Sequence, residues 1–99
     1  MTLTESQRRF LKGRAHPLKP VIQIGNAALT EAVVLETRRA LNDHELIKVR
    51  FRAADRTARD ALFAELAQRT ASTLVDRIGH VAILYRPREP KPKLLIPDP

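Results

Sequence analysis

The stretch HPLKPVIQIGNAALTEAVV, residues 16–34, decides how this chain folds. The prolines at its start favour extended backbone, and the apolar residues that follow predict a short strand over residues 21–24. Thr30 then predicts the start of a helix, because a threonine side chain can accept a hydrogen bond from a free N–H group of the first turn. Leu29 is placed to pack on Val34 and so to fix the direction in which the chain enters that helix.

The turn between this strand and this helix is Gly25-Asn26-Ala27-Ala28. A strand that leads through a glycine turn into a capped helix directs several unbonded backbone N–H groups toward one point in solvent. A phosphate group suits such a point, because the helix dipole adds positive potential there. Two interpretations of the turn stay open: a phosphate-binding loop, or a glycine that only closes a tight connection.

Length and composition indicate one basic domain. The 99 residues are enough for a single modest core, and 18 Lys and Arg against 11 Asp and Glu give a net charge of +7. This surplus favours a polyanionic partner, and a basic surface kept for solubility is the alternative. The absence of cysteine excludes disulfides and thiolate metal sites and fits a reducing cytoplasm, where we expect the protein to act. Neither a signal sequence nor an apolar run of membrane length is found, so no membrane partner is expected.

Residues 4–15 predict a helix with a basic side. Thr4 and Gln7 have the spacing of a capping box at its N-terminus. Three cations share the side opposite the apolar residues and form a predicted basic ridge: Arg8, Arg9 and Lys12. A solvated surface face is the alternative, but such faces usually mix charges, and Glu5 is the only acid before Glu31.

The clearest strand covers residues 46–52, where apolar and basic residues alternate. Alternation places one set on each face of a sheet, because successive strand side chains point in opposite directions. The apolar set is expected to face the core. The basic set, which contains no acid, then faces solvent as a cationic sheet face: Lys48, Arg50 and Arg52.

The remaining elements complete one domain, placed at residues 1–87. The central helix is expected to end near Leu41, and Asp43-His44-Glu45 is interpreted as a turn, because no second cluster of metal ligands accompanies it. Asp55 predicts the cap of a third helix. That helix is expected to end near Arg69. A hairpin of two strands, residues 73–78 and 81–86, is expected to follow it.

Residues 88–99 form a basic tail that is rich in proline. Such a composition predicts extended or disordered backbone. Its cations could follow a nucleic-acid backbone, whereas Leu94-Leu95-Ile96 could dock on the domain or on a partner.

The order of elements predicts an α/β fold in two layers. The sequence α-β-α-β-α-β-β is satisfied by a four-stranded mixed sheet with the helices packed on one face. Two successive β-α-β passages are expected to make parallel neighbours, and the closing hairpin adds an antiparallel strand. The other face of the sheet would then be open.

Three blocks of the sequence, in this order and spacing, resemble a known family: HPLKPVIQIGNAALTEAV, HELIKVRF and IGHVAILYRP. The chain resembles the bacterial YhbY-like proteins, which are stand-alone CRM domains (chloroplast RNA splicing and ribosome maturation), from Thr4 to the tail. The resemblance implies an RNA-binding domain similar in fold to the C-terminal domain of translation initiation factor 3. It also implies a role in maturation of the large ribosomal subunit.

The resemblance implies further that residues 25–28 correspond to a G-x-x-G loop, similar to the KH-domain loop that holds a nucleic-acid backbone. Here the second glycine is Ala28, a departure that would cost conformational strain if the position needs positive φ. A second departure lies at Thr70-Ala71, where the family usually has a glycine that closes the third helix. Lys19 matches the family pattern.

We therefore expect an RNA-binding protein that acts in ribosome biogenesis on ribosomal RNA of a large-subunit precursor, mainly through phosphate contacts. Ribosomal proteins are further candidate partners, a monomer is expected, and no cofactor, metal or catalytic residue is predicted. The expected RNA-binding residues are Arg8, Arg9, Lys12, Lys19, Gly25, Asn26, Ala27, Ala28, Lys48, Arg50 and Arg52.

Two other classes of function compare less well with the sequence. An enzyme is disfavoured, because Ser6 and Ser72 are the only serines, the histidines are far apart and no carboxylate pair stands out. A protein–protein adaptor on the pre-ribosome is the alternative, with Leu35 and residues 94–96 as its best sequence support. An adaptor predicts a weak dependence on salt, whereas phosphate binding predicts a steep one.

Overall fold

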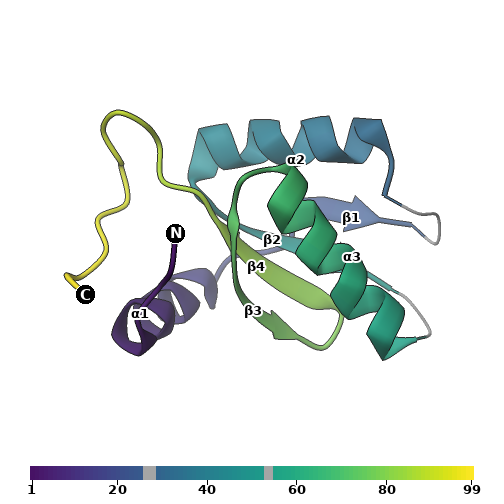
Figure 1. The fold of residues 1–99 in the computed structure, drawn as a ribbon, viewed down its shortest axis with the longest axis horizontal. Coiled ribbons are helices and arrows are strands. Elements are labelled where there is room, and N and C mark those ends of the chain that lie inside the picture. Colours follow the sequence, from purple (N-terminus) through teal and green to yellow (C-terminus); the bar gives the residue numbers. More distant parts are fainter. Residues whose placement is uncertain (26–28, 53–54) are drawn as a thin grey trace.

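The computed structural model describes residues 1–25, 29–52 and 55–99 (Figure 1). Within these residues, three helices and four strands follow one another in the predicted order. They are α1 (Glu5–Ala15), β1 (Ile22–Ile24), α2 (Glu31–His44), β2 (Leu46–Phe51), α3 (Arg56–Arg69), β3 (Thr73–Ile78) and β4 (Val81–Tyr85).

The strands form one mixed sheet in the order β1-β2-β4-β3. β1 and β2 are parallel neighbours, and β4 is antiparallel to both β2 and β3. The prediction that β2 and β3 are parallel neighbours is wrong, because β4 lies between them. β4 takes the inner place because its side chains from Ala82 to Tyr85 are buried on both faces of the sheet.

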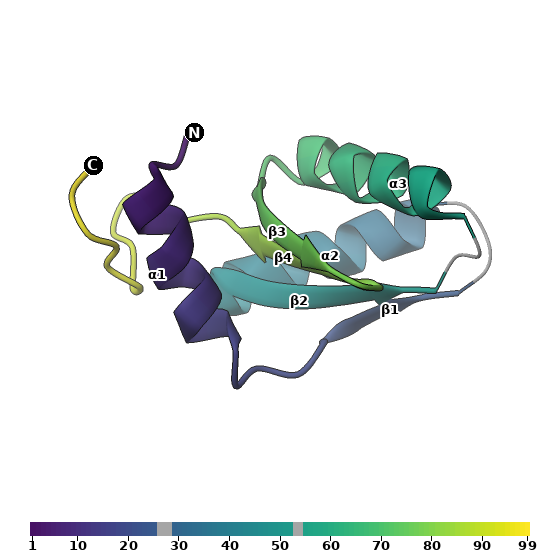
Figure 2. The same ribbon diagram turned by 90° about the horizontal axis from the view of Figure 1, so that it is seen from below.

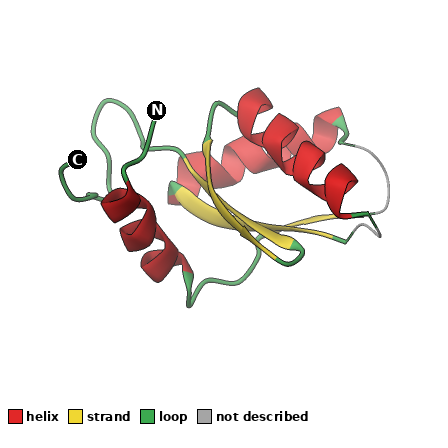
Figure 3. Ribbon diagram, turned by 60° about the horizontal axis from the view of Figure 1, so that its bottom comes forward, coloured by secondary structure: helices red, strands yellow, loops and turns green. Residues whose placement is uncertain are grey.

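Each face of the sheet has its own core. On one face, α2 and α3 pack over a cluster that includes Val49 and Leu84. On the other face, α1 packs over a smaller cluster that includes Leu46, Ile83 and Tyr85. Neighbouring residues of β4 alternate between the two clusters, as strand side chains must. Figure 3 shows the α2–α3 layer and, apart from it, α1 at one end of the sheet.

The predicted two-layer α/β fold with a four-stranded mixed sheet is confirmed. The expectation that the helices share one face holds for α2 and α3. α1 covers one end of the opposite face, because the apolar side chains of the smaller cluster need a cover there. Figure 2 shows that the carboxyl ends of β1 and β2 point away from α1.

The predicted helix starts are confirmed by their caps. Thr4 and Gln7 form the capping box of α1, and the Thr30 hydroxyl accepts a hydrogen bond from the Val33 N–H at 3.2 Å. The predicted end of α2 near Leu41 is too early, since the helix continues to His44. After α3 and its C-cap residue Thr70, Ala71 has a φ of 54°, in the left-handed conformation that favours glycine, which explains why a glycine would suit this position.

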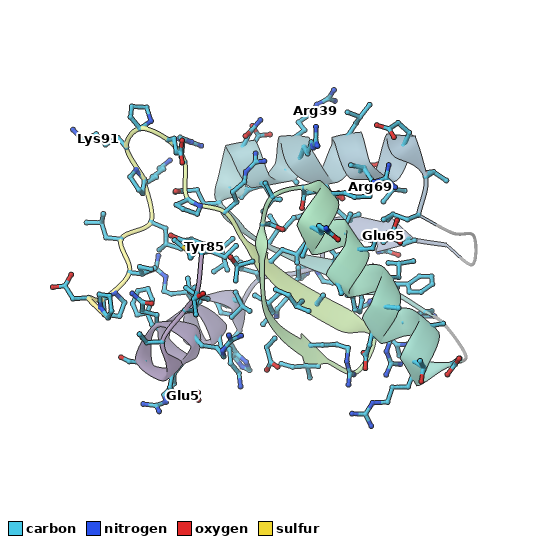
Figure 4. All side chains as sticks on the ribbon, in the orientation of Figure 1. Glu5, Arg39, Glu65, Arg69, Tyr85 and Lys91 are labelled. Atoms are coloured by element: carbon cyan, nitrogen blue, oxygen red, sulfur yellow. The ribbon has the colours of Figure 1, made fainter. Side chains whose placement is uncertain are left out.

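The turn predicted after α2 contains a buried acid that clasps the tail. Glu45 is 1% exposed and has a φ of 65°. Its carboxylate accepts hydrogen bonds from the backbone N–H groups of Arg88, Lys93 and Leu94 at 2.7, 2.9 and 2.8 Å. Leu94 and Ile96 pack on the cluster beneath α1, near Tyr85, which is labelled in Figure 4. Leu94 and Ile96 thus take the placement on the domain itself, whereas Leu95 between them is 75% exposed.

Candidate nucleic-acid interface

The carboxyl ends of β1 and β2 meet in a shallow hollow at one end of the sheet. Its lining residues are Gln23, Ile24, Gly25, Arg50 and Arg52. Two parallel strands end at the same edge of a sheet, and ligands of α/β folds often bind at such an edge. We call this region the open end. It lies away from α1 in both Figure 1 and Figure 2.

Strand alternation brings Arg50 to this place. Arg50 lies between Val49 and Phe51, which are buried on the side of α2 and α3, so its own side chain points to the opposite face. Gln23 is its direct partner on β1. Arg52 follows the end of β2 and is exposed. Neither arginine makes a side-chain hydrogen bond or an ion pair with any residue of the described ranges, so both guanidinium groups are available to a ligand.

Gly25 leaves β1 at the same point. A Cβ atom built on it would meet no atom within 4 Å, and its φ lies outside the left-handed region. The space beside its backbone is therefore open to a ligand. The predicted loop residues Asn26, Ala27 and Ala28 lie outside the described residues.

The start of α2 lies just beyond this turn and carries an acid of its own. Glu31 accepts a hydrogen bond from the Arg69 guanidinium of α3 at 2.9 Å. Figure 4 shows Arg69 and Glu65 on the part of α3 that lies beside α2, and Glu65 also pairs with Arg69 at 3.6 Å. Arg69 thus neutralises acids near the helix start, which lowers the repulsion that an approaching phosphate would meet.

The predicted basic ridge on α1 is largely occupied by contacts within the protein. The Arg8 guanidinium donates to the carbonyl of Leu74 at 3.3 Å and to that of Val75. Lys12 forms an ion pair with Asp76 at 3.1 Å. The sequence could not foresee this use, because β3 lies more than sixty residues away along the chain.

The ion pair with Lys12 also lowers the pKa of Asp76. Burial acts to raise the pKa of Asp76, but the Lys12 ammonium, the Arg77 N–H group and the nearby Arg8 outweigh burial and hold the pKa below its ordinary value. Of the ridge, Arg9 is the residue that stays exposed without such a contact among the described residues.

Two predicted lysines also lie away from the open end. The Lys48 ammonium donates to the carbonyls of His16 and Leu18 at 3.2 and 3.0 Å, and so fastens the α1–β1 connection to the sheet. Lys19 is exposed before the start of β1, in a groove shared with Arg14 and Lys93. Because β1 lies between Lys19 and Gly25, the two residues belong to opposite ends of the strand.

The structure therefore brings together three of the predicted residues, Gly25, Arg50 and Arg52, and adds one that the sequence did not suggest. Gln23 lies between two buried isoleucines of β1, so alternation alone could have placed it on the face of Arg50. Its position beside Arg50 depends on the strand register, which the sequence does not show.

The chemistry of the open end is that of an anion site. Two guanidinium groups and an amide can donate hydrogen bonds to phosphate oxygens, and backbone without a side chain permits close approach. Residues 1–25, 29–52 and 55–99 contain no group of three or more His, Asp or Glu side chains that could hold a metal ion. In the same ranges, no helix has the length and apolarity needed to span a bilayer.

Comparison with known proteins gives consistent matches over the whole fold. The family model of the CRS1 / YhbY (CRM) domain matches residues 3–86. A protein of Haemophilus influenzae named an RNA-binding protein is 46% identical over 88 residues, which cover 89% of each chain. A protein of Pseudomonas aeruginosa named a probable RNA-binding protein is 48% identical over 92 residues, covering 93% of this chain and 88% of the relative.

Relatives at lower identity are also described as RNA-binding proteins. A probable RNA-binding protein of Methanocaldococcus jannaschii is 36% identical over 99 residues, which cover 98% of this chain and 73% of the relative. The solution structure of a Staphylococcus aureus protein, described as a candidate RNA-binding protein, superposes with a TM-score of 0.83 at 30% identity. The match covers 97% of this chain and 100% of that one.

Proposed function

This chain belongs to the CRS1 / YhbY (CRM) domain family, and we propose that it binds RNA at the open end of its sheet. The names of the relatives support RNA as the partner. The structure supports the place, since Arg50 and Arg52 line a hollow together with Gly25.

One observation carries the proposal. Arg50 and Arg52 lie beside Gly25, and no side-chain hydrogen bond or ion pair ties either arginine to the part of the chain that the structure describes. Other cations, such as Arg8, Lys12 and Lys48, are bound to carbonyl or carboxylate oxygens of the protein. Free guanidinium groups bind phosphates with strong, charge-assisted hydrogen bonds, and phosphate contacts supply a large share of the affinity of a protein for nucleic acid.

We further propose that the RNA is ribosomal RNA in a precursor of the large subunit, and that the protein acts as a cytoplasmic monomer without catalysis. The resemblance to YhbY-like CRM domains supports this choice. Aromatic residues make up only 4% of the chain, which favours phosphate and shape recognition over stacking on aromatic rings.

The adaptor alternative has lost part of its support. Leu94 and Ile96, which an adaptor would offer to a partner, pack on the protein's own smaller cluster. Leu35 remains exposed on the outer side of α2, at 53%, but single exposed leucines are common on protein surfaces.

A salt series tests RNA binding directly. The affinity for a fragment of large-subunit ribosomal RNA is measured by fluorescence anisotropy from low to moderate salt. We expect a log–log slope of about −3 or steeper, which corresponds to roughly four phosphate contacts. A slope near zero, or no binding, would contradict the proposal and point to protein contacts instead.

The ribosomal setting needs a separate test in cells. The tagged protein is crosslinked to RNA, and the bound RNA is sequenced after the ribosomal particles are separated by sedimentation. We expect enrichment of large-subunit RNA in precursor particles. Crosslinks spread in proportion to RNA abundance would refute the ribosomal assignment and leave RNA binding in place.

A further inference from the structure

One line of side chains crosses the sheet on the face that carries α1 and is left exposed beside that helix. The strand registers pair Gln23 with Arg50, Arg50 with Val81, and Val81 with Ile78. Residues paired directly across strands point to the same face, so these four side chains form a continuous line over all strands of the sheet. We call this line the open row.

The cover provided by α1 ends just before the open row. In the preceding row, Ile83 is 1% exposed, and Asp76 is held by Lys12. In the open row, Ile78 is 61% exposed, Gln23 is exposed, and the two inner residues are half-buried. The open row is therefore the surface that remains where the smaller core stops.

The open row combines apolar and cationic groups. Val81 and Ile78 are an aliphatic pair on neighbouring strands, and Arg50 lies one strand away from Val81. Arg52 adds a second guanidinium beyond the end of β2. The row contains no acid, and the acid of the preceding row, Asp76, is neutralised by Lys12. This pattern complements a ligand that has an apolar face and a negative charge close together.

An unpaired nucleotide has this combination. The face of a base is flat and apolar, its edges carry hydrogen-bonding groups, and its phosphate is negative. We propose that the open row accepts an unpaired nucleotide, with the base resting on Val81 and Ile78 and the phosphate held by Arg50 and Arg52. This inference rests on the proposed RNA-binding function and names its ligand class: RNA with single-stranded nucleotides rather than continuous duplex.

The spacing of a sheet supports this arrangement. Directly opposed side chains on neighbouring strands have Cβ atoms about 5 Å apart, so Val81 and Ile78 together make a small flat platform. Arg50 is one further strand spacing away, about 4.8 Å, within reach of the phosphate of a nucleotide whose base lies on that platform. Gln23, at the end of the row, can hydrogen-bond a base edge or a neighbouring phosphate. A duplex cannot use the platform, because its base faces are stacked on one another.

Direct comparison of two RNAs tests the inference. The probes are a labelled RNA of about 12 nucleotides without self-complementarity, and the blunt duplex that it forms with its complement. A purely electrostatic surface would bind the duplex more tightly, since its phosphate density is higher. We expect the single strand to bind at least about fivefold more tightly than the duplex at the same salt concentration, by use of the platform.

Variants of Ile78 test whether the preference for single-stranded RNA depends on the open row. Ile78→Ser is expected to weaken single-strand binding about fivefold and to leave duplex binding unchanged, because it removes exposed apolar surface but no charge. Ile78→Tyr is expected to tighten single-strand binding about threefold or more, since a ring offers a better stacking surface. Leu35→Ser is the matched control: it removes an aliphatic side chain of similar exposure on α2, which packs on the opposite face of the sheet, and is expected to change neither affinity.

The outcomes separate the two proposals. If both RNAs bind equally, or if Ile78→Ser and Ile78→Tyr leave the single-strand affinity unchanged, the open row does not accept a base, although RNA binding stands. If neither RNA binds, the proposed function fails and the inference fails with it. Circular dichroism of each variant confirms that the fold is retained.

Discussion

The two ends of the sheet use the same kinds of charged residue in opposite ways. At the open end, Arg50 and Arg52 extend from β2 beside Gly25 and are bound to nothing else in the described residues. At the other end, which we call the clasped end and which comprises α1, Glu45, Lys48 and residues 86–99, five cations are bound to oxygens of the protein itself. Arg8 and Lys12 bind oxygen atoms of β3. Three further cations bind carbonyl oxygens elsewhere in the protein: Lys48, Arg86 and Arg88.

This difference shows that a basic composition is not one functional property. The five bound cations of the clasped end donate hydrogen bonds to carbonyl and carboxylate oxygens of the protein, so they stabilise the fold. At the open end, Arg50 and Arg52 make no side-chain hydrogen bond or ion pair within the described residues, so they are free to bind a phosphate. A net charge of +7 therefore overstates the charge that is available to RNA.

The largest expected effect comes from breaking the clasped end at its buried acid. Glu45→Ala leaves the N–H groups of Arg88, Lys93 and Leu94 without their acceptor. We expect a loss of about 3 kcal/mol in the free energy of unfolding, because buried donors without partners are costly. Urea unfolding measures it. Glu36→Ala, at an exposed acid of α2, is the control and should change stability by less than about 0.5 kcal/mol. Equal effects of the two variants would mean that the tail is not held by Glu45.

The second-largest expected effect is on RNA affinity, which is compared between variants of the open end and of the clasped end. The double variant Arg50→Gln/Arg52→Gln is expected to weaken RNA binding about tenfold or more and to leave stability nearly unchanged. The matched double variant Arg8→Gln/Lys12→Gln removes the same charge from the clasped end. It is expected to lower the melting temperature by several degrees and to weaken RNA binding less than about threefold. The reverse pattern would place the RNA on α1.

Low pH is expected to destabilise the protein through the clasped end. Burial acts to raise the pKa of Glu45, but the N–H groups of Arg88, Leu94 and Lys93 and the charge of Arg88 outweigh burial and lower it from the ordinary value of 4.5. Folding therefore favours the ionised acid, so its contribution is complete above that value and is lost as pH falls through the lower folded pKa. We expect the free energy of unfolding to fall below about pH 4.5 more steeply in the wild type than in Glu45→Gln.

Asp76 shifts in the same direction, through Lys12, and adds to the acid dependence. Asp76→Asn is therefore measured alongside as a reference. If Glu45→Gln retains the full acid slope of the wild type, the carboxylate does not fasten the tail.

The smallest expected effects come from one methyl group added at each end. Gly25→Ala should leave stability unchanged, since its Cβ would meet no atom within 4 Å, and should weaken RNA binding about threefold by obstructing close approach of the backbone. Gly13→Ala, on α1, also meets no atom and should stabilise the helix by about 1 kcal/mol without changing affinity. An unchanged affinity for Gly25→Ala would remove the glycine from the binding surface.

Much of the fold follows from local sequence signals. Thr4, Thr30 and Asp55 cap the three helices as predicted, because capping depends on residues within one turn. The inner place of β4 and the position of α1 on the second face depend on which apolar surfaces meet in three dimensions. Local patterns do not contain that information.

The candidate site is also predictable only in the part that depends on local sequence patterns. The alternation in residues 46–52 predicts Arg50 on the solvent-exposed face of the sheet, whereas the place of Gly25 beside Arg50 follows from the strand register. The roles of Arg8, Lys12 and Lys48 were not predictable, because their partners lie far away along the chain. The sequence predicts Glu45 only as part of a turn, because the N–H groups that it binds lie more than forty residues away along the chain.

The measurement that tests the central claim most directly is the salt dependence of RNA binding for the wild type and the two double variants. Each phosphate contact contributes about 0.7 to 0.9 to the log–log slope. We predict that Arg50→Gln/Arg52→Gln makes the slope shallower by about 1.5, whereas Arg8→Gln/Lys12→Gln leaves it unchanged. An unchanged slope for the open-end variant, with a shallower slope for the clasped-end variant, would contradict the claim that RNA is bound at the open end.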